Sequence, residues 1–253
     1  MLVAERQQKI LELVNDKKSV RVTDLSKAFS VTEETIRRDL EKLEVDQKLA
    51  RSHGGAISIS PSNSMEMSFA EREVKNIKEK RAIAYKAVKE VVEGDEIILD
   101  ASSTAWYMAK ALPDIPLTVL TNSNRVVMEL SAKKQITVIS TGGTLVSKSM
   151  SFVGPLAEST FNTYHVSKAF ISCNGLHMKH GISESDEMQA RIKDKMIESA
   201  ETVYVLLDHS KFGVKAFFRL NDINVADYII TNNKVNQETV KQLEENSIHV
   251  IKA

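Results

Sequence analysis

Two groups of residues in this 253-residue sequence have types and spacing that suit chemistry: an arginine pair near the N-terminus, and polar residues that follow short apolar runs further along. The pair, Arg37 and Arg38, lies within residues 20–43, where apolar side chains recur every three or four positions. This spacing predicts two short helices joined by a tight turn. Guanidinium groups on the polar face of the second helix can donate to phosphates and base edges, which predicts a DNA-reading element. The alternative is a surface helical hairpin with solvated arginines.

A β-hairpin is predicted directly after this element, over residues 48–59, because Gly54 and Gly55 permit the positive φ angles of a tight turn. Residues 2–14 supply a further helix. Three helices and a hairpin make a winged helix-turn-helix, whose wing would reach phosphates or the minor groove. Thr32 would cap the helix that carries the arginines. The residues expected to contact DNA are Thr32, Thr35, Arg37, Arg38, Arg51, His53 and Gly54.

The overall charge does not favour nucleic acid. The chain has 34 basic and 34 acidic residues, and residues 1–58 hold 11 Lys and Arg against 10 Asp and Glu. No global basic field therefore attracts a polyanion. Affinity for DNA must come from the local placement of a few cations and from the doubling of sites in a dimer.

The pattern changes after residue 58. Residues 59–68 are polar, contain Pro61 and are predicted as a linker between a DNA-binding domain at 3–58 and a second domain at 69–253. In the second domain, helical patterns alternate with short β-rich runs, several of them apolar on both faces. This alternation predicts an α/β fold with a mostly parallel sheet. The runs are 96–100, 117–121, 136–140, 168–173, 202–207, 227–231 and 248–251.

Small polar residues follow five of these runs, at the sheet edge where parallel sheets bind ligands. Hydroxyl and backbone N–H groups at a helix N-terminus can hold an anion. Each motif has a simpler explanation: the hydroxyls can be helix caps, the glycine pair at 142–143 a turn, and Asp208 with Lys211 an exposed ion pair. Together, however, the strand ends suit a small hydroxylated and phosphorylated molecule. Its phosphate would lie at residues 102–104, with Lys211 or Lys148 adding charge.

Several function classes lack their signatures. The sequence has no GxGxxG or Walker A pattern, no secretion signal and no long apolar span, and its six histidines are scattered. No cofactor and no metal are therefore expected, and the chain is predicted to be cytoplasmic. The lone Cys173 lies in an apolar run and is expected to be a buried packing residue.

The segments TIRRDLEKLE and ARSHGGA resemble the N-terminal signature of the DeoR family of bacterial repressors. KRAIAYKA, EIILDASST, TVLTNS, TGGTL, DKMIESA and DHSKFG resemble successive motifs of that family's sensor domain, which is similar to the ribose-5-phosphate isomerase and glucosamine-6-phosphate deaminase fold. The resemblance implies a sugar phosphate effector. Ala101 stands where relatives usually have glycine, so this turn either differs in shape or does not require glycine. The implied effector residues are Asp100, Ser102, Ser103, Thr104, Thr121, Asn122, Ser123, Gly142, Gly143, Asn174, Lys195, Asp208 and Lys211.

These features predict a transcriptional repressor of carbohydrate-metabolism genes that binds operator DNA as a dimer or tetramer and is controlled by a phosphorylated sugar. Release of DNA on effector binding is expected, and corepression is the other possibility. The rival is a sugar-phosphate isomerase or deaminase-like enzyme, which would use a base from Glu184, Asp186 or Glu187. Lys195 or Lys211 would then polarise the carbonyl. The same acidic residues can instead begin a helix. An enzyme gives no reason for a DNA-binding head, so regulation is preferred.

Overall fold

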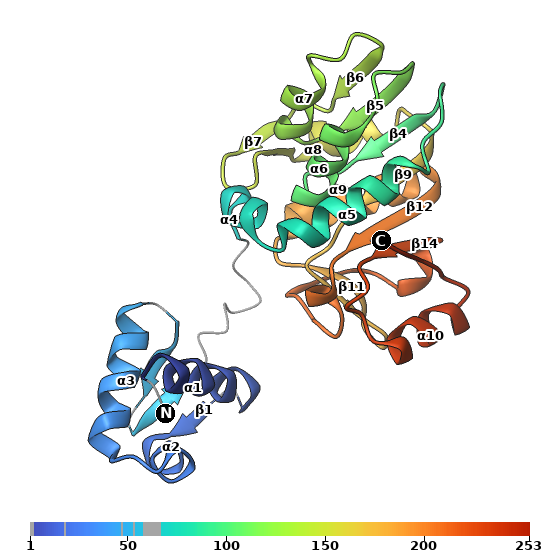
Figure 1. The fold of residues 1–253 in the computed structure, drawn as a ribbon. Helices are drawn as coiled ribbons and strands as arrows, with labels where there is room; N and C mark the ends of the chain where they lie inside the picture. Colours follow the sequence, from blue (N-terminus) through green and yellow to red (C-terminus); the bar gives the residue numbers. More distant parts are fainter. Residues whose placement is uncertain (1–2, 18, 47, 53, 58–66) are drawn as a thin grey trace. The chain divides into compact units, whose positions relative to one another are not determined.

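A computed structural model describes residues 3–17, 19–46, 48–52, 54–57 and 67–253 (Figure 1). The chain divides into two compact units, an N-terminal unit of Met1–Asn63 and a C-terminal unit of Ser64–Ala253. The predicted linker falls mostly on residues outside the described ranges, so its bounds at 59 and 68 stay predictions. No helix in the described part of the chain is long and apolar enough to cross a membrane.

The N-terminal unit is a winged helix-turn-helix, as predicted. Its apolar core joins all three helices through Ile10, Leu25 and Leu40, which are fully or almost fully buried. Ser30 ends the second helix in the left-handed conformation and turns the chain into the third. The elements are α1 (Val3–Lys17), β1 (Ser19–Arg21), α2 (Val22–Phe29), α3 (Glu33–Val45), β2 (Ala50–Ser52) and β3 (Gly55–Ile57).

The strand β1 is absent from the sequence-based prediction, and it changes the role of one glycine. β1 pairs antiparallel with β3, which places Arg21 opposite Gly55. A Cβ on Gly55 would lie 2.1 Å from the backbone oxygen of Val20, so glycine is needed there for close approach. Of the two glycines of the wing, only Gly54, at its tip, has a positive φ, of 84°. The wing is therefore a three-stranded sheet rather than an isolated hairpin.

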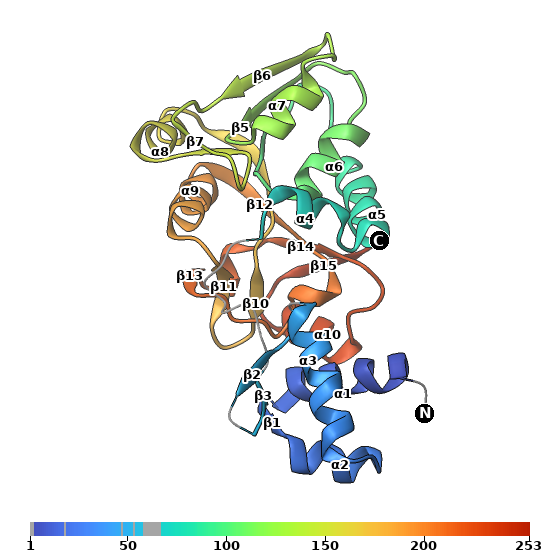
Figure 2. The same ribbon diagram turned by 90° about the vertical axis from the view of Figure 1, so that its left-hand side faces the viewer.

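The C-terminal unit is built on a seven-stranded sheet in the order β15-β14-β12-β9-β4-β5-β6, in which every neighbouring pair is parallel (Figure 2). Its strands are β4 (Glu96–Leu99), β5 (Leu117–Thr121), β6 (Ile136–Ser140), β9 (Val166–Ile171), β12 (Ala200–Leu207), β14 (Tyr228–Thr231) and β15 (His249–Lys252). Short antiparallel ladders stand beside it: β7 (Thr144–Val146) with β8 (Ser151–Val153), and β10 (Gly175–His177) with β11 (Gly181–Glu184) and β13 (Phe218–Asn221).

Helices cover both faces of this sheet, which explains the strands that are apolar on both sides. Ile97 and Leu99 of β4 pack in one core, whereas Ile98 between them packs in the other. The first core includes residues of α4 (Phe69–Val74), α5 (Ile77–Val88), α6 (Ser103–Ala111) and α7 (Asn124–Leu130). The second includes residues of α8 (Pro155–Phe161), α9 (Glu187–Glu198), α10 (Gln237–Glu245) and the short 3-10 helix Ile223–Val225. A second 3-10 turn, His209–Lys211, follows β12.

The strand order decides which polar strand ends can meet. β9 lies between β4 and β12, so the residues that follow these three strands share one edge of the sheet. β5 and β6 lie on the far side of β4. Ala101 follows β4 and is not one of the described residues with positive φ, so this turn does not require the glycine that relatives usually have.

Candidate functional site

The helix α3 carries the predicted DNA-contacting arginines on its exposed side. Thr32 caps the helix by accepting from the backbone N–H of Thr35 at 3.3 Å. Arg37 lies 2.9 Å from Glu33, and Arg38 lies 3.5 Å from Glu34, so each guanidinium pairs with a carboxylate one turn earlier. Both arginine side chains remain about half exposed or more, at 49% and 79%.

The opposite side of α3 is anchored to α1. Asp39 is 4% exposed, and it accepts from the guanidinium of Arg6 at 2.6 Å and from the amide of Gln7 at 3.0 Å. These bonds fix the rotation of α3 about its axis. The arginine pair is therefore held on the surface of the unit.

The wing adds further cations. Arg51 is exposed, and its backbone N–H donates to the Glu44 carboxylate at 3.0 Å, which ties the wing to α3. Arg21, which sequence reasoning did not select, lines the same surface hollow as Ser52 and Gly54 because β1 pairs with β3. His53 lies outside the described residues. No sequence signal pointed to Arg21, since its place depends on an unexpected strand.

A cavity opens at the shared edge of β4, β9 and β12, and we call it the strand-end cavity. Its lining is polar and cationic, with only Met67 and Cys173 as weakly polar or apolar members. The lining residues are Met67, Arg72, Lys75, Asn76, Lys80, Ser102, Ser103, Thr104, Ser172, Cys173, Asn174, Lys193, Asp208, Ser210 and Lys211.

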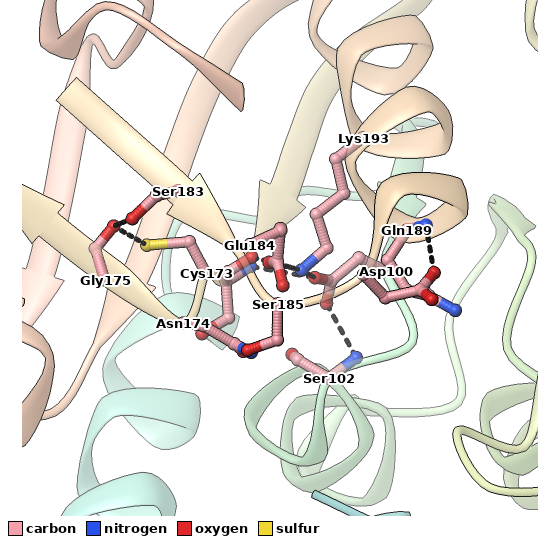
Figure 3. A network of polar contacts seen from close by, with 12 residues as sticks. Asp100, Ser102, Cys173, Asn174, Gly175, Ser183, Glu184, Ser185, Gln189 and Lys193 are labelled. Carbon is pink, nitrogen blue, oxygen red and sulfur yellow. Dashed lines mark hydrogen bonds and ion pairs between the residues drawn. The ribbon is translucent and has the colours of Figure 1, made fainter. Parts of the chain in front are cut away.

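Lys193 of this lining belongs to a buried ionic cluster, which we call the floor of the cavity (Figure 3). The ammonium group of Lys193 lies between two carboxylates, 3.2 Å from Asp100 and in direct contact with Glu184, and it donates to the backbone oxygen of Ser172 at 2.5 Å. All three charged side chains are buried. Asp100 also accepts from the backbone N–H groups of Ser102 at 3.0 Å and Ser172 at 2.9 Å, so it joins the ends of β4 and β9.

The cations of the cavity have shifted pKa values with identifiable causes. Burial lowers the pKa of Lys80 to about 8, an effect that Asp208 opposes and that Lys211, Arg72 and Lys75 reinforce. Burial also lowers the pKa of Lys211. Burial disfavours the charged form of Lys193 too, but Glu184 and Asp100 outweigh it and raise that pKa. Within the described lining, four lysines stand beside one carboxylate, Asp208.

About half of the effector residues implied by the sequence lie together in this cavity. Ser102 caps α6 by accepting from the N–H of Ala105 at 3.0 Å, so the simpler explanation of a helix cap is correct for it, although it also faces the cavity. Asp208 is buried and is no exposed ion pair with Lys211. The implied residues that line or floor the cavity are Asp100, Ser102, Ser103, Thr104, Asn174, Asp208 and Lys211.

The remaining implied residues lie outside the lining. Asn122 is held by Phe152 of β8, which accepts from its side-chain amide at 3.0 Å. Ser123 caps α7, and the hydroxyl of Thr121 donates to the oxygen of Leu99 at 2.6 Å. Lys195 is on the outer side of α9, 2.6 Å from Glu198. For these residues and for Gly142 and Gly143, contact with an effector stays a prediction without support from the cavity. Lys148, the suggested additional cation, does not line the cavity either.

Sequence reasoning missed the cavity residues Arg72, Lys75, Asn76, Lys80 and Lys193. A signal existed for two of them. Lys80 stands within the apolar stripe of its helix, three residues after Ile77 and three before Ile83, and Lys193 lies between Ile192 and Met196. A lysine within an apolar stripe is a cation that the fold will bury. The other three, Arg72, Lys75 and Asn76, reach the cavity because of how α4 and the turn after it pack.

The residues proposed for enzymatic work are dispersed. Glu184 is bound to Lys193 in the floor, Asp186 caps α9 by accepting from the N–H of Gln189 at 3.0 Å, and Glu187 is exposed beside Arg191 at 2.8 Å. Cys173 is 2% exposed, and burial raises the pKa of its thiol to about 12, which confirms its expected role in packing. Within the described residues, no three His, Cys, Asp or Glu side chains gather as a metal site.

Comparison with known proteins assigns both units. A profile described as the DeoR-like helix-turn-helix domain matches residues 6–62, and one described as the DeoR C terminal sensor domain matches residues 75–233. The chain is 54% identical over 250 residues to the HTH-type transcriptional regulator YulB of Bacillus subtilis, covering 99% of this chain and 96% of that one. It is 37% identical to an L-fucose operon activator of Haemophilus influenzae, with 97% and 98% covered. It is 32% identical to the transcriptional repressor GlcR of Bacillus subtilis, with 99% and 96% covered.

Solved structures give distant likenesses. Ribose 5-phosphate isomerase A of Methanocaldococcus jannaschii matches with a TM-score of 0.41 and 18% identity, covering 55% of each chain. The full-length sorbitol operon regulator SorC of Klebsiella pneumoniae matches with a TM-score of 0.44 and 11% identity, covering 94% of this chain and 97% of that one. Neither likeness bears on what the cavity binds. The curated relatives are named as regulators, not as enzymes, so the enzymatic interpretation is set aside.

Proposed function

Since the chain belongs to the DeoR family of DNA-binding transcriptional regulators, we propose that it is a cytoplasmic repressor of carbohydrate-metabolism genes and that a phosphorylated sugar in the strand-end cavity controls it. Named relatives include a transcriptional repressor and an activator of an L-fucose operon. Repression with release of DNA on effector binding is the form that we propose here.

The charge of the strand-end cavity is the observation that carries this proposal. Among the described lining residues, Lys75, Lys80 and Lys211 share the cavity with one carboxylate, Asp208, while Lys193 is held by two buried carboxylates. A phosphate monoester carries about −1.5 to −2 charges at pH 7. One such group would relieve the mutual repulsion of these lysines.

The remaining lining favours a hydroxylated ligand over an aromatic one. Serine, threonine and asparagine side chains follow the ends of β4, β9 and β12 around the cations, and they can donate to or accept from sugar hydroxyls. Among the described lining residues there is no aromatic side chain that could stack on a base. A phosphorylated sugar supplies both the charge and the hydroxyl groups.

DNA binding by the N-terminal unit requires more than one copy. One winged helix reads only a few base pairs, so a homodimer or homotetramer on repeated half-sites is proposed. The proposed contacts are Arg37 and Arg38 on α3 and Arg21 and Arg51 in and beside the wing. A ligand that favours one arrangement of the paired heads changes DNA affinity by about 5–150-fold in typical regulators.

A thermal-shift screen of the full chain tests the effector. Glucose 6-phosphate, fructose 1-phosphate, inorganic phosphate and the unphosphorylated sugars are compared at equal ionic strength. At least one sugar phosphate should raise the melting temperature more than its parent sugar, and it should then lower affinity for a DNA duplex selected by the chain from a random library.

Two lysine variants locate the site. Lys211→Met removes a cation of the cavity and should abolish the shift, whereas Lys195→Met removes an exposed cation paired with Glu198 and should retain it. If no sugar phosphate stabilises the chain beyond its parent sugar, or if both variants respond as the native chain does, the proposed effector site is wrong.

A further inference from the structure

One wall of the strand-end cavity belongs to residues 67–76, which we call the wall segment. These residues are the first described ones of the C-terminal unit, and they comprise α4 and the turn that leads into α5. Met67, Arg72, Lys75 and Asn76 of this segment line the cavity. The segment is therefore the part of the ligand site that stands nearest in sequence to the DNA-binding unit.

Packing fixes the start of the wall segment. Phe69 is buried edge-on against Trp106, with ring centroids 5.8 Å apart, and its backbone N–H donates to the oxygen of Lys148 at 2.7 Å. Tyr107 donates to the oxygen of Glu73 at 3.2 Å. At the other end of the segment, Asn76 makes polar bonds across the cavity.

Asn76 makes those bonds from an unusual backbone conformation. It is left-handed, with φ 52° and ψ 41°, a region that asparagine tolerates better than most residues. It precedes α5 without capping it through its side chain. Its amide instead donates across the cavity to Asp208 at 2.9 Å and to the hydroxyl of Ser210 at 3.2 Å. The wall segment is thus joined to residues 132 positions away, at the end of β12.

Positive charges lie on both sides of this junction. Lys75 of the wall segment and Lys211 both line the cavity, and the charge of Lys75 adds to the burial that lowers the pKa of Lys211. Among the described lining residues Asp208 is the only carboxylate, and its Oδ1 atom accepts from Asn76 and from the backbone N–H of Ser210 at 2.9 Å. An anion between Lys75 and Lys211 would replace repulsion with attraction on both sides.

We infer that the wall segment is the element through which the ligand acts on DNA binding: an anionic group drawn between Lys75 and Lys211 closes the segment onto the end of β12, and Asn76 is the positioning residue that transmits this closure. The inference rests on the proposed function. A ligand shifts an equilibrium only by its differential affinity for two states. In this inference the closed wall segment adds Lys75 as a second cation beside the ligand, and this contact makes the difference in affinity. In sequence, residues 58–66 connect the segment to the DNA-binding unit.

Asn76→Gly is the variant that isolates this role. Glycine accepts the left-handed conformation without strain, so the backbone is kept while both side-chain bonds to Asp208 and Ser210 are lost. Ser247→Gly is the matched control, because Ser247 is also left-handed, with φ 63°, and it is exposed before β15. Thermal unfolding of the three proteins shows whether each variant is folded.

The probe is inorganic phosphate, the part common to all phosphorylated sugars, compared with chloride at equal ionic strength. Hydrogen exchange of the amides of residues 67–76 reports local opening of the wall segment. In the native chain and in Ser247→Gly, phosphate should slow this exchange by about 5–150-fold, the usual range of coupling between sites. In Asn76→Gly, phosphate should slow this exchange much less than it does in Ser247→Gly.

The outcomes separate this inference from the proposed function. If phosphate stabilises all three proteins and slows exchange equally in Asn76→Gly, the coupling role of Asn76 is overturned and the effector site stands. If the native chain is stabilised without any change in exchange at residues 67–76, the wall segment is not the coupling element. If neither phosphate nor any sugar phosphate stabilises the native chain, the effector site and the inference fail together.

Discussion

Helix α3 and the strand-end cavity hold their cations in opposite ways. On α3, Arg37 and Arg38 are exposed, and each has a carboxylate one turn earlier, in Glu33 and Glu34. In the cavity, lysines lie close together in a partly desolvated space, and Asp208 is the only carboxylate among the described lining residues. Each arginine of the first set has a carboxylate of its own, whereas the lysines of the second set lie near other cations.

This difference fits two ways of binding an anion. Exposed ion pairs contribute little to stability, about 0.2–1 kcal/mol, so a guanidinium on α3 can exchange its carboxylate for DNA at small cost. Partly buried lysines that repel one another, as Lys75, Lys80 and Lys211 do, are stabilised when an anion binds among them. DNA binding should therefore depend steeply on salt, whereas the cavity should select one small anion and be stabilised by it.

The largest difference in unfolding free energy should be between variants of two lysines that are two residues apart. Lys193→Met leaves Asp100 and Glu184 buried without their cation and should cost about 3–5 kcal/mol of unfolding free energy. Lys195→Met breaks only an exposed pair with Glu198 and should cost less than about 1 kcal/mol. Urea denaturation of the full chain measures both. Equal losses would contradict the description of Lys193 as the centre of a buried cluster.

Arginine substitutions on α3 should have the next largest effect, and on DNA binding only. Arg37→Ala or Arg38→Ala should weaken binding to a selected duplex by about 1–3 kcal/mol if each contacts a base. The melting temperature and the response to sugar phosphate should be unchanged, because both side chains are exposed.

Arg191→Ala provides the control, since it removes an exposed pair with Glu187 on α9. Its DNA affinity, measured by fluorescence anisotropy, should equal that of the native chain. Normal DNA binding by both α3 variants would show that α3 is not the reading helix.

Lys80 should link stability, ligand binding and pH. Its pKa lies near 8 in the folded chain against 10.5 ordinarily, so the folded state loses this proton first as pH rises. Between pH 8 and pH 10.5 the unfolded state binds more protons, and this group makes the folded state more stable with rising pH. Below pH 8 its unfavourable contribution is fully present.

Lys80→Met should therefore raise the melting temperature at pH 7, and this gain should shrink as pH approaches 10. The same variant should bind phosphate more weakly, and the native chain should lose phosphate affinity above pH 8 as Lys80 loses its charge. Calorimetry at pH 7 and pH 9 checks these outcomes. A variant that is less stable at pH 7 and binds phosphate normally would remove Lys80 from the charge argument.

The smallest effects are expected for the carboxylates of α3. Glu33→Gln or Glu34→Gln should change stability by only about 0.3–0.5 kcal/mol. Each frees an arginine for DNA, which should steepen the dependence of log K on log salt by up to about 0.9 for non-specific duplex. Glu41→Gln, an equal charge change two turns further along the same exposed face, should leave the slope as it is. A slope that is the same in all three variants would contradict balanced pairs on α3.

Sequence patterns predicted the helices of the N-terminal unit well because each apolar stripe is formed by residues three or four positions apart. The spacing around Ile36, Leu40 and Leu43 defines α3, and Thr32 caps it as expected. The strand β1 could not be predicted, since three residues of extended chain are stable only when β3 is available to pair with them. Because β1 was not predicted, Arg21 was not identified either.

In the larger unit the same reasoning placed every strand of the parallel sheet but selected only part of the cavity. Polar residues after β5 have the same composition as those after β4, yet Asn122 is bound by β8, whereas Ser103 and Thr104 face the cavity. The order of strands in the sheet separates these motifs, and no local pattern contains that order. Lys195 was chosen over Lys193 for a similar reason, because the register of α9 against the sheet decides which lysine is buried.

Local periodicity and short motifs were thus enough to predict a DNA-reading head and a parallel α/β unit, because helices, turns and strands are specified by neighbours in the chain. The family was indicated by the resemblance of quoted segments to known motifs, and the comparisons show it. Long-range packing determined which charged side chains lie together in the folded chain. Asn76 and Asp208 meet, and Lys193 enters between Asp100 and Glu184, through contacts between residues far apart in the chain, and the energy of a charge depends on what surrounds it once the chain has folded.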